Sequence, residues 1–480
     1  MSTYNHSSSF INSISYLHNQ NHNYRDPYRK YTEKSDQKSS SLMQNGNRIL
    51  SKVSTPYKNT NPYLKDKPFF QSQSFSGTDN LFRDNNYSLS NNFRRKQIGE
   101  DFSNYNFNQN KNNFKYRDYN LDYNKKNDIN VINENENENN NNSEKLYSII
   151  LSKIGLSNLG DTCYMNVCLQ NLIHSKNFIN NLLLKKSIIS ERNTPITKEF
   201  LKLCEKMSIS RGGSIAPEDF RNVFCKKHKE YRKYAQFDTI EFCRYLLEDI
   251  SSELNEIKQK TPYRELSTFS KSKIQCFREF EELFRSKENS IVIDSFYGQI
   301  INIFVCPCTH RMYSFQNFLD LPLLLPGGID STSINELLSQ YFKEEYISFN
   351  SKCENCHRRT NHYKEIKISI PPNILILSLQ RKDERTNRKN NCLVKFEEKI
   401  KINDYIDQEC QNGNKYIYHL YAVGCHAGNI NYGHYYAYIK INNQDWYEFN
   451  DSKVNYIGGD IETKSTYVYV LFYKRRKIKK

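Results

Sequence analysis

The chain contains the stretch Gly155-Leu-Ser-Asn-Leu-Gly-Asp-Thr-Cys-Tyr-Met-Asn-Val-Cys-Leu-Gln-Asn-Leu-Ile173, which has the pattern of a polar turn followed by a helix. In its second half, apolar side chains recur at steps of three and four residues and form one face: Met165, Cys168, Leu169, Leu172 and Ile173. Cys163 then falls in the first turn of the predicted helix. Because a helix N-terminus helps to ionise a thiol and its amides stabilise an oxyanion, Cys163 is a candidate nucleophile.

Cys163 also has a simpler interpretation. An isolated Cys at a helix start is most often a small buried hydrophobic residue. Asp161 places a negative charge two residues before Cys163, which opposes ionisation of the thiol, and we expect its carboxylate to turn outward. A catalytic role for Cys163 therefore requires a base elsewhere in the chain.

A candidate base lies far downstream, in Asn431-Tyr-Gly-His-Tyr-Tyr-Ala-Tyr-Ile439. His434 follows Gly433 and starts an aromatic strand, so we expect its ring at a sheet edge where backbone approaches a substrate closely. Asn450 and Asp451 follow one strand later and offer an amide or a carboxylate to fix the tautomer of the ring. A histidine in a Tyr-rich strand is also commonly structural, and spacing alone leaves both roles open.

The remaining periodic segments indicate an α+β fold. Apolar residues at helical spacing between Ile240 and Ile257 predict a second helix that packs on the first. Strand patterns come late in the chain, at 366–372, 374–380, 416–424, 434–441 and 466–473. Helices early and an antiparallel sheet late are typical of α+β domains.

Composition divides the 480 residues into three parts. Residues 1–147 are rich in Asn, Ser, Tyr, Lys and Arg and contain none of the 13 cysteines. So polar a stretch buries too little apolar surface to offset chain entropy, and we predict a disordered low-complexity arm. Residues 148–475 are predicted to form one domain with an inserted subdomain, and residues 476–480 are a basic tail.

The charge and the cysteine content of the chain limit the classes of protein that fit this sequence. The net charge of +16 favours anionic partners, but no recognised nucleic-acid module is present, so we predict a solvated basic surface without a nucleic-acid partner. The odd number of cysteines indicates reduced thiols. No segment has a membrane span or the apolar core of a secretory signal, so we expect no membrane partner and a cytoplasmic or nuclear location, or both.

Several blocks resemble the ubiquitin-specific protease family of papain-like cysteine peptidases, the ubiquitin carboxyl-terminal hydrolases. Gly155–Asn166 resembles its Cys box, and Tyr432–Tyr438 with Trp446–Asp451 resembles its His box. Blocks between them are also similar to the family: Gln236–Phe242, Asn289–Gln299, Phe318–Pro322, Cys353–Cys356 and Pro372–Leu377. The resemblance covers about residues 154–473 and implies a papain-like fold with thumb, palm and fingers subdomains.

The resemblance implies a role for each candidate. Cys163 corresponds to the family's nucleophile and His434 to its general base. Asn450 corresponds to the third catalytic residue, and the adjacent Asp451 is a secondary candidate. Asn158 matches the side chain that donates to the oxyanion. The implied reaction is thiol-dependent hydrolysis of the isopeptide or peptide bond at the C-terminal Gly of ubiquitin, through a thioester and without a catalytic cofactor.

The resemblance also implies how a substrate is bound. Asp238 matches an acidic position that faces the basic tail of ubiquitin, and Gly433 lets backbone approach the substrate. Two residues depart from the family pattern: Phe237 replaces the second Gln of Gln-Gln-Asp, and Asp161 replaces an Asn. We expect ubiquitin and ubiquitinated proteins as partners of a monomer. An inactive ubiquitin-binding protein and a protease for another ubiquitin-like modifier are the alternatives.

Four cysteines suggest a metal site. Cys353-Glu-Asn-Cys356 has the spacing of half a tetrahedral zinc site, and Cys306-Pro-Cys308-Thr-His310 supplies further ligands. The resemblance implies that two such pairs hold a structural zinc at the tips of the fingers. The upstream pair is tighter than the family's usual C-x-x-C, so His310 is an alternative to one sulfur, and a degenerate finger with free thiols is the other possibility. The remaining thiols are interpreted as core or surface residues: Cys168, Cys204, Cys225, Cys243, Cys276, Cys392, Cys410 and Cys425.

Overall fold

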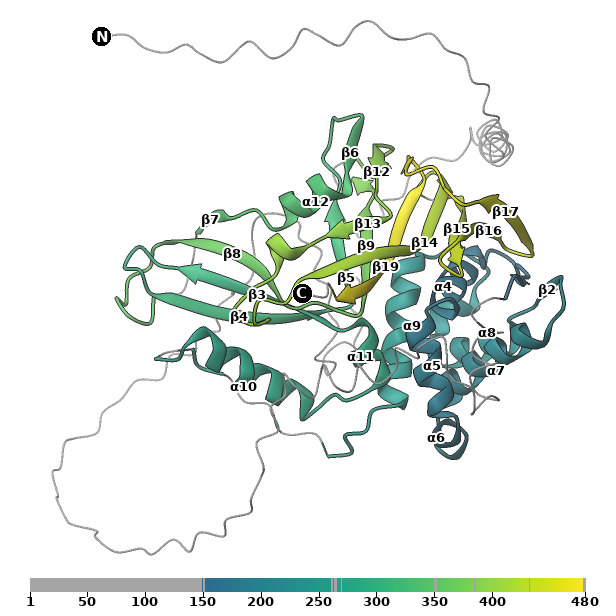
Figure 1. The fold of residues 1–480 in the computed structure, drawn as a ribbon, viewed down its shortest axis with the longest axis horizontal. Helices are drawn as coiled ribbons and strands as arrows, with labels where there is room; N and C mark the ends of the chain where they lie inside the picture. The colour runs from purple at the N-terminus through teal and green to yellow at the C-terminus, as the bar shows by residue number, and fades with distance from the viewer. Residues whose placement is uncertain are drawn as a thin grey trace, which may run out of the picture. The chain divides into compact units, whose positions relative to one another are not determined.

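The computed structural model describes residues 152–259, 270–348, 352–383, 386–430 and 432–477, with a few short pieces beside them. The predicted N-terminal arm and the last three residues of the basic tail lie outside these ranges. Within them, helices predominate up to residue 296 and strands predominate after it, so the prediction of an α+β fold is confirmed (Figure 1). Among the described residues, none of the helices is both long and apolar enough to cross a membrane.

A group of helices forms the first half of the described fold: α4 (Cys163–Ile173), α5 (Lys176–Leu184), α6 (Lys186–Glu191), α7 (Pro195–Ile209), α8 (Glu218–Lys227), the 3-10 helix η2 (Lys229–Arg232) and α9 (Thr239–Glu253). α4 begins at Cys163, which therefore lies in the first turn as predicted. All its side chains are buried because α9 packs on it and it lies against the largest sheet. Asp238 caps α9 by accepting two backbone N–H groups of its first turn. α9 ends at Glu253, so the helix predicted to extend to residue 257 is about one turn too long.

The largest sheet follows in the order β17 (Lys453–Gly458), β16 (Asp445–Asn450), β15 (Gly433–Ile441), β14 (Tyr416–Gly428), β19 (Val468–Lys477), β9 (Ile374–Gln380) and β5 (Asp320–Leu324), and β13 (Lys399–Lys401) pairs with β14. Its neighbouring strands are antiparallel except for the parallel pair β5 and β9. β9 is almost wholly buried because it lies between two other strands, which explains its continuous apolar sequence. The sheet therefore holds β15 and β16, which carry the candidate base and its neighbours, side by side.

A second sheet has four antiparallel strands in the order β4 (Arg311–Phe318), β3 (Gly298–Val305), β8 (Asn361–Ile370) and β7 (Glu345–Ser348). It extends away from the α4–α9 helices (Figure 1). The loops β3–β4 and β7–β8 leave the same end of this sheet and carry the four cysteines of the predicted metal site. Cysteines far apart in the sequence are thereby brought together.

Shorter elements complete the described chain: β1 (Gly155–Leu156) with β2 (Ser214–Ile215), β10 (Lys382–Asp383) with β11 (Arg388–Lys389), the strands β6 (Ser331–Ser333), β12 (Leu393–Lys395) and β18 (Lys464–Ser465), α10 (Lys273–Arg285), α11 (Ile291–Phe296), α12 (Ile334–Tyr341) and η3 (Asn403–Tyr405). α10 follows one face of the four-stranded sheet, where Phe277 and Phe280 contact Phe315 of β4 (Figure 1). A large apolar core fills the region between the two sheets and α12, and Trp446 is fully buried in it.

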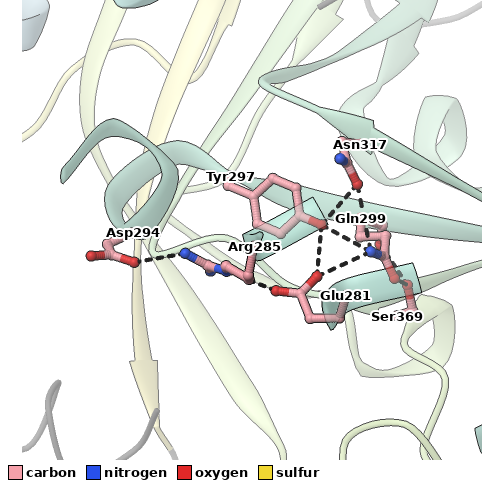
Figure 2. A network of polar contacts seen from close by, with 7 residues as sticks. All are labelled: Glu281, Arg285, Asp294, Tyr297, Gln299, Asn317 and Ser369. Atoms are coloured by element: carbon pink, nitrogen blue, oxygen red, sulfur yellow. Dashed lines mark hydrogen bonds and ion pairs between the residues drawn. The ribbon is translucent and has the colours of Figure 1, made fainter. Parts of the chain in front are cut away.

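A buried polar network joins α10 to the four-stranded sheet. Figure 2 shows its members: Glu281, Arg285, Asp294, Tyr297, Gln299, Asn317 and Ser369. The Tyr297 hydroxyl lies 2.7 Å from the Asn317 carbonyl oxygen and 3.0 Å from a Glu281 carboxylate oxygen, so its single hydrogen is donated to one of these two acceptors, and it accepts from Gln299 Nε2 at 2.8 Å. The Ser369 hydroxyl donates to Gln299 Oε1 at 2.7 Å. Because Gln299 and Ser369 are fully buried, these bonds replace those that water would make.

We expect Tyr297→Phe to lower the free energy of unfolding by about 1–3 kcal/mol, because the buried Gln299 and the half-buried Asn317 would each lose a partner. Urea unfolding of the full chain measures the change. Tyr363→Phe is the matched control, since it removes a hydroxyl that contacts Glu344 on the exposed side of the same sheet. A loss for Tyr297→Phe no larger than that of the control would contradict the structural role of the network.

Candidate active site

The loop before α4 is closed by its own side chains. Asn158 Oδ1 accepts the backbone N–H of Gly160 at 3.0 Å and that of Thr162 at 3.1 Å. Asp161 has the left-handed backbone angle φ of 52°, and its side chain is exposed, as the sequence predicts. These bonds place the amide of Asn158 beside the start of the helix that carries Cys163.

Cys163 is the first residue of α4, and only 3% of its surface is exposed. Burial raises the pKa of its thiol to about 12, because the charged form loses water. The backbone N–H groups of Tyr435 and Tyr164 lower that pKa, whereas the charges of Asp451 and Asp161 raise it further. In the protein without substrate, burial therefore opposes the ionisation of the thiol that the helix N-terminus is expected to favour.

His434 lies opposite α4, at the beginning of β15. Its Nε2 is 2.7 Å from Oδ1 of Asn450, the last residue of the neighbouring strand β16. Because an amide oxygen only accepts, the hydrogen of this bond belongs to Nε2, and Nδ1 is the basic nitrogen of that tautomer. The next residue along β15, Tyr435, directs its backbone N–H to the Cys163 sulfur. The fold thus places the start of β15, with His434 and its partner Asn450, beside the helix that begins at Cys163.

Asp451 makes a different set of contacts from Asn450. Its carboxylate accepts Nδ2 of Asn158 at 2.9 Å and Nδ2 of Asn166 at 2.8 Å. Its backbone has a left-handed φ of 49°, and its carbonyl accepts the N–H of Leu156 at 2.8 Å. A Cβ on Gly155 would lie 2.7 Å from the same carbonyl oxygen, so this glycine lets the Cys-bearing loop pack against Asp451. Asp451 therefore orients Asn158 rather than His434.

Asp238 lies between the helices and the largest sheet. Besides capping α9, its carboxylate accepts the hydroxyl of Tyr469 from β19. Six residues further along α9, Arg244 donates to both oxygens of the buried Asp320 at 2.9 Å, and Ser378 donates to the same carboxylate at 2.5 Å. These contacts hold α9 against the sheet and leave Asp238 at the junction of the two.

Comparison with known proteins shows which family the chain belongs to. Residues 154–473 match the family described as ubiquitin carboxyl-terminal hydrolase. The protein belongs to this family. Its relatives include ubiquitin carboxyl-terminal hydrolase 2 of Gallus gallus, 30% identical over 346 residues that make up 68% of this chain and 94% of that protein. Usp2 of Drosophila melanogaster is 29% identical over 333 residues, 67% of this chain but only 34% of that longer protein.

Solved structures of the SAGA DUB module support the same fold. The SAGA Ubp8/Sgf11/Sus1/Sgf73 DUB module bound to ubiquitin aldehyde matches with a TM-score of 0.54 and 24% identity, over 68% of this chain and 71% of the matched chain. The same module bound to monoubiquitin matches with a TM-score of 0.55 and 22% identity, over 74% of each chain. The predicted protease fold of this hydrolase is thereby confirmed for the described residues.

Some residues of this hydrolase's site were not among those predicted. Gln236 exchanges two hydrogen bonds with the backbone of Gly433, directly before His434. Lys389 donates to two carbonyl oxygens of the hairpin that leads to Gly433, those of His426 and Gly428. Neither contact could be recognised from a local sequence pattern. Lys389 is nearly 40 positions from its two partners, and Gln236 is 197 positions from Gly433. The one hint for Gln236 was its place in a block that resembles the family.

The four predicted metal ligands of this hydrolase lie in one cluster, with all four sulfurs within 4.8 Å of one another. Cys306 and Cys356 have their sulfurs 3.7 Å apart, and Cys308 and Cys353 have theirs 3.6 Å apart. Four sulfurs around one zinc at bonds of about 2.3 Å would be separated by about 3.8 Å, so the donor set fits tetrahedral zinc. His310 is not a member of the cluster, and its Nε2 lies 3.7 Å from a Glu354 oxygen.

We expect alkylation of Cys163 in the protein without substrate to accelerate about tenfold per pH unit between pH 7 and 9. A thiol with a pKa of about 12 is almost fully protonated in this range, and its reactive thiolate increases tenfold with each unit. Brief treatment with iodoacetamide followed by peptide mass spectrometry measures this site separately from the other thiols. A rate that is already constant above pH 7 would show that the thiolate forms before substrate binds.

Proposed function

We propose that this protein is a deubiquitinase that hydrolyses the isopeptide or peptide bond after the C-terminal glycine of ubiquitin. One observation carries the proposal: Nε2 of His434 is 2.7 Å from Asn450 Oδ1, while the next residue, Tyr435, directs its N–H to the Cys163 sulfur. A buried thiol, a base and an orienting amide are the parts that acyl transfer needs. Membership of the hydrolase family and structural neighbours bound to ubiquitin support the choice of substrate.

In the proposed mechanism, His434 acts as a general base at the moment of attack. The raised pKa of Cys163 means that the thiol keeps its proton until the substrate arrives. Nδ1 of His434 then takes this proton while the sulfur bonds to the carbonyl carbon of the terminal glycine. The same proton passes to the departing amine of the lysine side chain, and the C–N bond breaks to leave a thioester. Water, deprotonated by His434, then attacks the thioester carbonyl. The C–S bond breaks to release the C-terminal carboxyl group of ubiquitin, and His434 returns the proton to the Cys163 sulfur.

Asn158 is proposed to stabilise the negative oxygen of the tetrahedral intermediates. One hydrogen of its Nδ2 is donated to Asp451 at 2.9 Å, which fixes the plane of the amide beside the start of α4. The second hydrogen of the same nitrogen is then held in a constant direction. A donor that is oriented in advance stabilises developing charge without reorganisation, which is usually the largest single contribution to such catalysis.

We further propose that the four-cysteine cluster binds structural zinc. Four protein ligands would leave no open position for water, so the metal would stabilise the tips of the four-stranded sheet and take no part in the reaction. We expect metal analysis to find about one zinc per chain. We also expect a strong chelator to lower the thermal midpoint by several degrees, an effect that added zinc reverses and added magnesium does not. Zinc-free protein with an unchanged midpoint would favour a finger with free thiols.

A cleavage panel tests the proposed function. The purified full chain is incubated with fluorogenic reporters at the C-terminus of ubiquitin and of SUMO, and with diubiquitin joined through lysine. We expect hydrolysis of the ubiquitin reporter and of diubiquitin, and much slower hydrolysis of the SUMO reporter. Preference for SUMO would replace the substrate in the proposal. Binding of ubiquitin without hydrolysis would mean that the protein is a reader and not an enzyme.

A further inference from the structure

Gln236 connects the helical part of the fold to the strand that carries His434. Its Oε1 accepts the backbone N–H of Gly433 at 2.7 Å, and its Nε2 donates to the Gly433 carbonyl at 2.9 Å. One side chain thus holds both polar groups of the residue that directly precedes His434. The geometry resembles a rung between two paired strands, but it joins elements that are 197 residues apart in the sequence.

The opposite side of Gly433 is also constrained. A Cβ at this position would lie 2.1 Å from Nε2 of His426 and 2.5 Å from the carbonyl oxygen of Ala427, so only glycine fits against β14. Lys389 holds the β14 strand of the same hairpin end by donating to the carbonyls of His426 at 2.6 Å and Gly428 at 3.1 Å. Gly433 is therefore held between β14 and Gln236. A substitution of Gln236 removes its two hydrogen bonds to Gly433 and leaves the contact with β14 in place.

Gln236 is itself tied to the helix that carries the nucleophile. Three residues further on, the Thr239 hydroxyl donates to the carbonyl of Tyr164, the residue after Cys163, at 2.8 Å. Between them, Asp238 caps α9 and accepts the hydroxyl of Tyr469. A short series of contacts therefore leads from the Cys163 helix through the start of α9 to the peptide before His434.

We infer that Gln236 is a positioning residue, which sets the place of His434 relative to Cys163 through the Gly433 peptide. The side chain of Gln236 is exposed, and exposed hydrogen bonds add little to folding stability, so a stabilising role alone does not account for a bidentate contact at this position. A base displaced by a fraction of an ångström reacts markedly more slowly. The inference rests on the proposed hydrolase activity and adds to it a residue that need not touch the substrate.

The test compares kcat and KM of wild type and Gln236→Met with a fluorogenic reporter at the C-terminus of ubiquitin, together with the thermal midpoint of each protein. Met is similar in size to Gln but forms neither hydrogen bond with Gly433. We expect kcat to fall about tenfold, the effect of losing two neutral hydrogen bonds that orient the base, with KM changed less than threefold. A second variant, Gln236→Glu, retains the acceptor for the Gly433 N–H and should lose less activity than Gln236→Met.

Gln408→Met is the matched control, because Gln408 also donates from an exposed side chain to the backbone, at the Asn403 carbonyl, and lies outside the site. It should retain the kcat of wild type. An unchanged kcat for Gln236→Met, or for Gln236→Glu if the Met variant does not fold, would overturn the inference. So would a raised KM at constant kcat, which would mean that Gln236 contacts the substrate. An inactive wild type would instead contradict the proposed function, so the two failures are distinguishable.

Discussion

His434→Ala is expected to lower kcat/KM on a ubiquitin C-terminal reporter by about 10³-fold or more, because it removes the proposed base for a thiol whose pKa is about 12. Asn450→Ala is expected to cost about 10- to 100-fold, since it removes the bond of 2.7 Å that orients the ring but leaves the base. Steady-state kinetics at saturating and limiting reporter concentrations measure both.

Two further variants make this prediction specific. His419→Ala removes a histidine that lies towards the opposite end of β14 from Ala427, the residue paired with His434, and its activity should remain within about twofold of wild type. Asn450→Ala added to His434→Ala should cause no further loss, because Asn450 acts only through the imidazole. An additional tenfold loss in the double variant would mean that Asn450 contacts the reacting groups directly.

Asn158→Ala is expected to lower kcat about 100- to 1000-fold with little change in KM, because the oxyanion forms only after the sulfur attacks. Asp451→Ala is expected to lower kcat about tenfold, since Asn158 would lose the partner at 2.9 Å that orients its amide. Kinetics on the ubiquitin reporter, with thermal unfolding to verify that each variant is folded, measure these effects.

The double variant of Asn158 and Asp451 separates positioning from direct catalysis. If Asp451 acts by orienting Asn158, its replacement should cost little once Asn158 is already Ala. The full tenfold loss in the Asn158→Ala background would instead make Asp451 an independent catalytic residue, as the adjacent position in the sequence first suggested. The structure favours the first outcome, because Asp451 contacts Asn158 and Asn166 whereas Asn450 contacts His434.

Local pattern was enough to predict the elements that are buried on one face or on both. Cys163 lies in the first turn of α4 and β9 occupies residues 374–380, both as predicted, because continuous or periodic burial produces a recognisable pattern in the sequence. α10 was missed, although it starts with a capping box formed by Ser272 and Gln275 and has a strongly amphipathic sequence. Its many charged residues obscured the apolar face that packs on the four-stranded sheet.

The long-range features of the site could not be predicted from local pattern. The contact between Asn158 and Asp451 joins residues 293 positions apart, and it exists because β1 and the end of β16 meet beside α4. The pKa of Cys163 likewise depends on the segments that cover it, which a helix start alone does not reveal. Resemblance to the family supplied the candidate residues, and the fold then separated the contacts of Asn450 from those of Asp451.

The most direct test of the proposed chemistry is to react the full chain with a ubiquitin whose C-terminus carries a cysteine-trapping electrophile. Mass spectrometry of the intact protein then measures the adduct. We predict one ubiquitin adduct on wild type, none on Cys163→Ala and slower formation on His434→Ala. An adduct that persists on Cys163→Ala, or its absence from folded wild type, would contradict Cys163 as the nucleophile of a deubiquitinase.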